Sequence, residues 1–309
     1  MPILNQEKKQ EKAIGFSVYS NNLNRELAPL FTRDNDTHKG TVDIFESQNE
    51  KFQIARISDH LQIQTEKGFY MSSKYAKPFM FLSEKIAQAI SSNTKPLDET
   101  SKGLEITINR AEWDMRTGTK KSVRSFEELY NGLLGLSSMV VVYKVIRNGK
   151  AIALCGGHLI GEDLTLDEDK KTIKLVIPPK AVELYILEAP QRAILGESFY
   201  RIPSLNPFAA AFVSFLSMEM DARHCNSFYL DIKDMIERLS INTNLRRKDK
   251  EIMQPIQRTV SEAQKHGFQI EYVTAANGEP NEADMTTWTR FYELRLKITD
   301  KRPEKSDQN

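Results

Sequence analysis

The chain has 309 residues, of which 40% are hydrophobic and 28% are charged, and its formal net charge is +1. This length allows two globular domains, and the composition excludes a disordered or fibrous chain. Because the whole chain is almost neutral, it can bind nucleic acid only through local clusters of cations. It contains no run of about 18 apolar residues and no hydrophobic signal core, so we expect a cytoplasmic protein without a membrane partner.

The first quarter of the chain and its last residues differ from the rest. Residues 1–12 and 300–309 are polar and without a period, which is typical of frayed or disordered tails. Between residues 13 and 77, short alternating runs predict strands at Gly15–Tyr19, Thr41–Phe45, Phe52–Ile57 and Leu61–Thr65. We therefore treat residues 1–77 as an N-terminal extension that is strand-rich and whose role is open.

A clearer pattern begins at Phe79 and covers residues 78–200. Apolar spacing and turn residues predict, in order, a helix, a strand, a short helix, a second helix and a strand hairpin. The hairpin surrounds Asn148-Gly149, a strong signal for a two-residue turn. The predicted elements are Phe79–Ile90, Leu104–Ile108, Arg110–Arg116, Val123–Leu136, Met139–Ile146 and Ala151–Ile160, with a further strand at Thr172–Ile177.

The same order of elements returns in residues 201–299. A helix starts at Pro207 with Asn206 as its expected cap, and the long helix ends at His266-Gly267. The predicted elements are the helix from Pro207, strand Phe228–Ile232, helices Asp231–Leu239 and Ile252–Lys265, and strands Phe268–Val273 and Trp288–Ile298. We predict an α+β chain of two tandem winged-helix domains, divided near residues 196–206, with an additional N-terminal segment.

Cations gather before the long helix of each predicted domain, where a winged helix meets DNA. Duplex binding needs cations along the phosphates and a few side chains that reach base edges. The first candidate group is Arg116, Lys120, Lys121, Ser122 and Arg124, with Arg147 and Lys150 at the hairpin turn. The second group is Arg246, Arg247, Lys248, Lys250, Gln254, Gln257 and Arg258, with Arg290 and Arg295 on the expected last strand. The alternative interpretation is that these runs are only solvated helix faces.

Motifs for catalysis or for a cofactor are not present. The sequence has no phosphate-binding GxxxxGK[ST] loop, and its five His residues are scattered. The acidic run Gly161–Lys171 lacks the ligand spacing of a calcium loop and predicts an acidic hairpin loop. Cys155 and Cys225 are expected to be free thiols. We expect a protein that is not an enzyme and needs no metal or cofactor.

Two segments carry a resemblance to a known family. They are FYLDIKDMIERLSI (Phe228–Ile241) and RRKDKEIMQPIQRTVSEAQKHGFQIEYV (Arg246–Val273). Over residues 78–299 the chain resembles the replication initiator (Rep) proteins of iteron-controlled, theta-replicating plasmids. In that family the second segment is the recognition helix of the C-terminal domain and its wing strand. Leu104–Met115 and Ser125–Leu136 would be the N-terminal counterparts, whereas residues 1–77 are longer than the usual pattern.

The resemblance implies a function in plasmid DNA replication. It implies binding to directly repeated origin sites (iterons), opening of the origin, and recruitment of a host initiator and the replicative helicase. It also implies a monomer–dimer equilibrium in which dimers bind an inverted operator and repress the protein's own promoter. Two alternatives stay open: a winged-helix transcriptional regulator without an origin function, and a structural or partner-binding protein.

Overall fold

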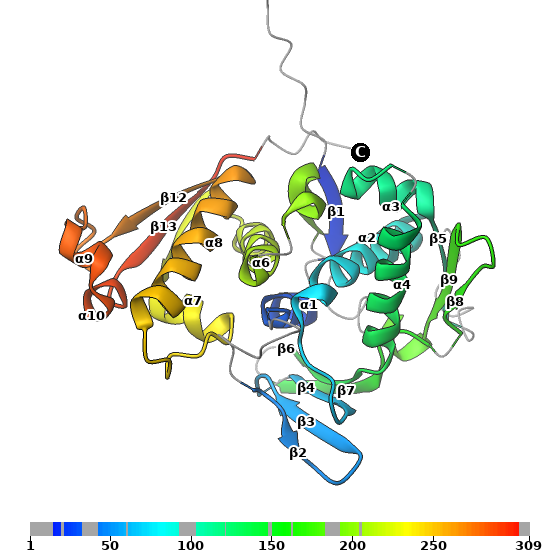
Figure 1. Ribbon diagram of the computed structural model, residues 1–309. Coiled ribbons are helices and arrows are strands. Elements are labelled where there is room, and N and C mark those ends of the chain that lie inside the picture. The colour runs from blue at the N-terminus through cyan, green and yellow to red at the C-terminus, as the bar shows by residue number, and fades with distance from the viewer. Residues whose placement is uncertain are drawn as a thin grey trace, which may run out of the picture.

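A computed structural model describes residues 15–19, 22–32, 43–59, 61–92, 103–120, 122–147, 150–161, 163–182, 192–203 and 206–302. Within these residues the fold is α+β, with small antiparallel sheets arranged around buried helices (Figure 1). No described helix is both long and apolar enough to cross a membrane. The expected tail is partly ordered, because Asp300 ends a strand and the Arg302 guanidinium pairs with its carboxylate at 2.6 Å.

The N-terminal extension is built into the rest of the fold. Its elements are β1 (Gly15–Tyr19), α1 (Asn22–Leu27), η1 (Ala28–Leu30), β2 (Glu46–Ser47), β3 (Phe52–Arg56) and β4 (Leu61–Glu66). Strand β1 pairs with β10 (Arg192–Gly196), far along the chain. The strand expected at Thr41–Phe45 is wrong for residues 43–45, which lie outside any strand, and residues 41–42 lie outside the described residues.

The first unit, which corresponds to the first predicted domain (residues 78–200), follows the predicted order of elements from its first helix to its long helix. It contains η2 (Ser73–Tyr75), α2 (Ala76–Ser92), β5 (Leu104–Asn109), α3 (Arg110–Thr117), α4 (Val123–Ser137), β8 (Thr165–Leu166) and β9 (Thr172–Ile177). Buried and exposed residues alternate along β5, as expected for a strand with one face on the core. Gly118 ends α3 in the left-handed region (φ 72°), which glycine adopts without strain.

The hairpin predicted for the first unit forms, but it does not join the sheet of that unit. Strands β6 (Val140–Arg147) and β7 (Lys150–His158) form, but β6 pairs with β4 and belongs to a separate sheet of order β2-β3-β4-β6-β7. Strand β5 instead pairs with β9, and β9 pairs with β8. The alternating buried residues of β4 give β6 a partner from the extension, which local sequence patterns cannot show. The acidic run of Gly161–Lys171 supplies β8 and the β8–β9 turn, as predicted.

Helix α6 (Pro207–Arg223) follows η4 (Glu197–Arg201) and is the first helix of the second unit, which corresponds to the second predicted domain (residues 201–299). Its residues from Phe208 to Met220 are buried all round, because α6 packs on α8 of the second unit and on α2, β10 and η1. Asn206 occupies the expected N-cap position, but its side chain makes no capping hydrogen bond. The Asn206 amide oxygen does not cap the helix but accepts a hydrogen bond from the Thr259 hydroxyl at 3.1 Å. The expected boundary at residues 200/201 therefore falls inside continuous, shared packing.

The second unit repeats the topology of the first. It contains β11 (Ser227–Asp231), α7 (Ile232–Arg238), η5 (Asp249–Met253), α8 (Gln254–Lys265), β12 (Phe268–Val273), α9 (Glu282–Thr286), α10 (Trp288–Phe291) and β13 (Arg295–Asp300). The sheet order β11-β13-β12 corresponds to β5-β9-β8. In both sheets the strand before the short helix pairs with the last strand of the sheet, which in turn pairs with the strand before it; in the first unit the β6–β7 hairpin is inserted between the long helix and that strand.

Two parts of the second unit depart from the predicted pattern. Pro255 cannot donate a backbone hydrogen bond, and the turn before it, η5, widens to a π-helix at the start of the long helix. The last strand begins at Arg295 rather than at Trp288. Trp288 and Tyr292 stand four residues apart with ring centroids at 5.4 Å, so this segment forms a helical turn instead of a strand.

Candidate nucleic-acid interface

An exposed cationic cluster leads into helix α8. Arg246, Arg247 and Lys250 are exposed, and the Lys248 ammonium lies 5.7 Å from the centre of the Trp288 ring. The backbone N–H of Arg247 donates to the Glu251 carboxylate at 3.2 Å, which orders the start of the helix. Within the described part of the chain, no carboxylate forms an ion pair with the side chain of Arg246, Arg247 or Lys250. These charges are therefore available to an external anion.

Helix α8 turns one face to the core and another to solvent. The predicted apolar stripe is confirmed, since Ile252, Ile256, Val260 and Ala263 are all buried. Gln254 and Arg258 are exposed on the opposite face, one turn apart. Side chains of this length and polarity can reach base edges in a major groove.

The third residue predicted on this face is partly engaged within the protein. Gln257 is half-buried, and its amide nitrogen donates to the carbonyl of Met285 at 3.3 Å. The exposed polar face of α8 is therefore carried by Gln254 and Arg258, with Gln257 at its margin beside the β12–β13 connection.

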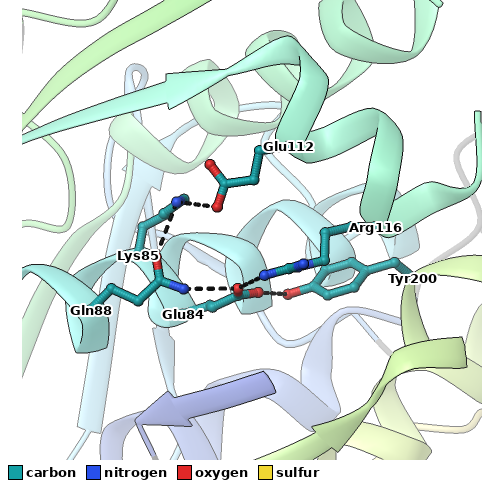
Figure 2. Close-up of polar contacts among 6 residues, drawn as sticks. All are labelled: Glu84, Lys85, Gln88, Glu112, Arg116 and Tyr200. Atoms are coloured by element: carbon teal, nitrogen blue, oxygen red, sulfur yellow. Dashed lines mark hydrogen bonds and ion pairs between the residues drawn. The ribbon is translucent and has the colours of Figure 1, made fainter. Parts of the chain in front are cut away.

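The prediction that Arg116 contacts DNA is wrong. Arg116 is only 9% exposed, and its guanidinium pairs at 2.6 Å with the fully buried carboxylate of Glu84 on α2. The hydroxyl of Tyr200, on η4, donates to the other oxygen of that carboxylate at 3.1 Å (Figure 2). Burial and the neighbouring Glu84 raise the pKa of Tyr200, so its proton stays in this network. Arg116 thus joins α2 to α3 and η4.

The other predicted residues at the start of α4 have mixed surroundings. Lys120 is exposed. The Ser122 hydroxyl caps α4 by accepting the backbone N–H of Ser125 at 3.1 Å. The Arg124 side chain, 90% exposed, pairs at 3.2 Å with Glu128 one turn later. Lys121 lies outside the described residues. This group is therefore less cationic than its sequence suggests.

The hairpin turn predicted as a basic wing lies in another sheet. Arg147 ends β6 and Lys150 begins β7, and their side chains lie outside the described residues. The turn in the corresponding position joins β8 to β9 and is acidic. The Asp167 carboxylate there accepts the backbone N–H groups of Thr172 at 2.9 Å and Lys171 at 2.6 Å, which hold its pKa below the usual value.

The two arginines predicted near the end of the chain are separated and paired. Arg290 lies on α10 rather than on a strand, and its guanidinium is 3.9 Å from the Asp284 carboxylate. Arg295 begins β13, donates to Asp231 at 2.8 Å, and lies 4.8 Å from the centre of the Tyr229 ring. Among the described residues, no hydrogen bond or ion pair joins either arginine to the cluster before α8, and both charges are partly compensated.

Helices α4 and α8 lie on either side of α6 (Figure 1), and a cleft beside α4 was not predicted from the sequence. The cleft has a volume of about 1290 Å³ and is lined by α2, α4, the end of α3 and residues 200–203. A groove of about 450 Å³ runs along α8 past Arg258 and Lys265. Both are bordered by Pro203 and Asn206, so they are neighbours on one surface. Lysine spacing alone gives no signal for such a site.

Comparisons with known proteins give structural neighbours only. No protein-family profile and no curated protein sequence matches the chain. A crystal structure of domains 2 and 3 of RctB, a replication initiator of a Vibrio chromosome, is similar over 91% of this chain and 97% of that chain, with 10% identity and a TM-score of 0.46. A second structure, RctB residues 155–483, gives 11% identity and a TM-score of 0.41 over 90% and 96%. Similarity at this level carries no information about function.

Proposed function

We propose that both units are winged helices and that this protein binds duplex DNA, with α8 in the major groove. The observation that supports this most strongly is the second unit itself. Apart from the short helical turns η5, α9 and α10, its elements run helix, strand, helix, helix, strand and strand, and its sheet has the order first, third, second, as in a winged helix. The exposed face of its third helix, α8, follows directly on the Arg246–Lys250 cluster.

Charge and side-chain length support a division of labour on this surface. Arg246, Arg247 and Lys250 would neutralise phosphates, because exposed cations without an internal carboxylate displace condensed counterions from DNA. Gln254 and Arg258 would contact base edges, with Arg suited to guanine and Gln to adenine. Each good bidentate contact discriminates against a wrong base by roughly 1–3 kcal/mol.

At the level of biology we propose a replication initiator of the plasmid Rep type. Together with the resemblance of Phe228–Ile241 and Arg246–Val273, the repeated unit supports binding to directly repeated origin sites. Origin opening and recruitment of a host initiator and replicative helicase follow from that proposal. No catalytic step is proposed for the protein itself, and we propose that it works in the cytoplasm without a cofactor.

We propose in addition that the protein forms dimers that bind an inverted operator. Strand β7 stands at the end of the described sheet β2-β3-β4-β6-β7, and an unpaired edge can pair with a second copy. Strand β6 lies between β4 and β7, so the two edges of this sheet are β7 and the two-residue β2, and β7 is the longer edge. Val142 on β6 stands opposite Gly156 of β7 and is half-buried, whereas Val141 is buried. Val142→Glu is expected to shift the protein toward monomers in light scattering, whereas a wild-type protein that is monomeric at tens of micromolar would contradict the dimer.

The direct test measures the affinity of the protein for duplex DNA by fluorescence anisotropy. The duplexes carry direct repeats taken from the DNA that lies beside the gene for this protein. Wild-type protein is expected to bind them tightly and to make nearby AT-rich DNA reactive to permanganate. Arg246→Ala with Arg247→Ala is expected to remove specific binding while the fold remains, because exposed substitutions change stability by less than about 0.5 kcal/mol. Unchanged affinity of the double variant for these duplexes would refute the assignment of α8 as the recognition helix. Binding without melting would favour a winged-helix transcriptional regulator.

A further inference from the structure

The cleft between α4 and the residues that follow η4 contains an incompletely compensated lysine. Lys77, at the start of α2, lines this cleft and donates to the backbone carbonyl of Ile202 at 2.7 Å. A lysine ammonium has three N–H donors, so two remain for another acceptor. No carboxylate lies within ion-pair distance of Lys77 among the described residues. Its only direct partner among the described residues is therefore the Ile202 carbonyl, and Glu128 acts on it from beyond ion-pair distance.

The surroundings of Lys77 make an anion a favourable addition. Burial lowers its pKa to about 8, against the opposing attraction of Glu128 across the cleft. The ammonium is therefore mostly protonated at neutral pH although it has lost part of its hydration. An anion in the cleft would restore the lost stabilisation of the charge. Lys74 and Arg201 line the same cleft together with one acid, Glu128, so cations outnumber acids in its lining and an anion is favoured.

The position of the cleft indicates which anion it would take. Pro203 and Asn206 border both this cleft and the groove along α8, where Arg258 and Lys265 lie. A DNA strand that runs from α8 toward α4 would pass over Pro203 and Asn206. A duplex is the anion that supplies phosphates in a continuous row along such a path.

We infer that the cleft binds a phosphate of the DNA strand that runs between α8 and α4, and that Lys77 contacts this phosphate directly. The inference rests on the proposed DNA binding and adds a site between the two helices. A free nucleotide carries the same phosphate chemistry, so the test must separate it from duplex DNA.

The main test compares salt dependence in a matched set of variants. The wild type, Lys77→Met, Lys77→Arg and the control Lys67→Met are titrated against a duplex of about two helical turns, at several salt concentrations. Lys67 is exposed in the turn after β4 and lies outside the cleft. Loss of one phosphate contact is expected to reduce the slope of log K against log salt by about 0.9 in Lys77→Met. Lys77→Arg and Lys67→Met should retain the wild-type slope.

The possible outcomes separate this inference from the proposed function. If the wild type shows no salt-sensitive duplex binding, DNA binding itself fails. If the wild type binds and Arg258→Ala weakens binding, but Lys77→Met keeps the full slope, only the phosphate site is overturned. A second experiment uses calorimetry to measure whether the wild type and Lys77→Met bind ATP, a free nucleotide. ATP binding that needs Lys77, together with an unchanged DNA slope, would assign the cleft to a free nucleotide and overturn the inference.

A pH series gives a second readout of the same contact. The charged groups that face Lys77 are Glu128 on α4, His266 at the end of α8, and Lys74 and Arg201 in the cleft lining. Burial lowers the pKa of His266, so it is neutral above pH 7. Between pH 7 and 9 the wild type is expected to lose several-fold more affinity than Lys77→Arg. Equal losses would contradict a direct Lys77–phosphate contact.

Discussion

The first and second units share one topology but use their cations differently. In the second unit, Arg246, Lys250 and Arg258 are exposed, with no ion pair among the described residues. In the first unit, two acids of α4 neutralise nearby cations: Glu128 pairs with Arg124 of the same helix, and Glu127 pairs with Lys170 of the β8–β9 turn. A repeated fold therefore does not imply a repeated function, because the charge on the long helix of each unit, α4 or α8, decides how strongly that unit attracts phosphate.

The first helix of each unit carries a buried acid, and its partners also differ. Glu84 on α2 pairs with Arg116 from the same unit, whereas Glu219 on α6 pairs with Arg223 at 2.6 Å and with Arg25 of the N-terminal extension at 2.9 Å. In the first unit, Arg116, which was predicted to contact DNA, thus stabilises the fold instead. In the second unit the corresponding acid holds the extension, and the cations before α8 stay at the surface.

The largest expected effect comes from removing the buried acid of the first unit. Glu84→Gln would leave the Arg116 charge buried without its partner, which typically costs about 3–5 kcal/mol. Glu128→Gln is the matched control, because the Arg124–Glu128 pair is exposed and worth under about 0.5 kcal/mol. Urea unfolding of both variants measures the difference. Similar losses in the two would show that Arg116 has no special role in the fold.

An intermediate effect is expected at the corresponding acid of the second unit. Burial disfavours the charge of Glu219, but Arg25 and Arg223 outweigh it and hold the pKa of the carboxyl below its usual value. A lowered folded-state pKa stabilises the protein above the unfolded pKa of about 4.3 and loses that contribution as pH falls. Glu219→Gln should therefore lower Tm at pH 7 by roughly 2–4 °C.

The pH dependence provides the control for Glu219. The Tm difference between wild type and Glu219→Gln should shrink as the pH falls through the lowered pKa, since both side chains are then neutral. A difference that stays constant from pH 7 to pH 3 would mean that shape, rather than charge, accounts for the effect.

A smaller effect is expected from unmasking the cations of the first unit. Glu127→Gln with Glu128→Gln would free Lys170 and Arg124, and should raise duplex affinity by roughly two- to five-fold at low salt. The control is Glu46→Gln with Glu50→Gln, which makes the same change in net charge on exposed positions near β2. Equal gains from both pairs would indicate a general charge effect and no contact between α4 and DNA.

The helices and strands from α2 onward follow the sequence closely, because apolar periodicity and turn residues are local signals. The pairing of β6 with β4 was not predictable in this way, since the partner lies in a segment with weak patterns of its own. The same limit applies to the candidate site. Arg116 stands in an acid-free run, yet its partner Glu84 lies 32 residues earlier. The Lys77 site requires α2 to pack beside residues 202–203, which only the tertiary structure brings together.

The central claim is that the second unit supplies most of the phosphate contacts. The direct measurement is the salt dependence of duplex binding for two matched double variants, Arg246→Ala with Lys250→Ala and Lys120→Ala with Arg124→Ala. The slope of log K against log salt is expected to fall by about 1.8 in the first and by less than about 0.9 in the second. An equal or larger fall in the Lys120 and Arg124 variant would contradict the assignment of DNA binding chiefly to α8.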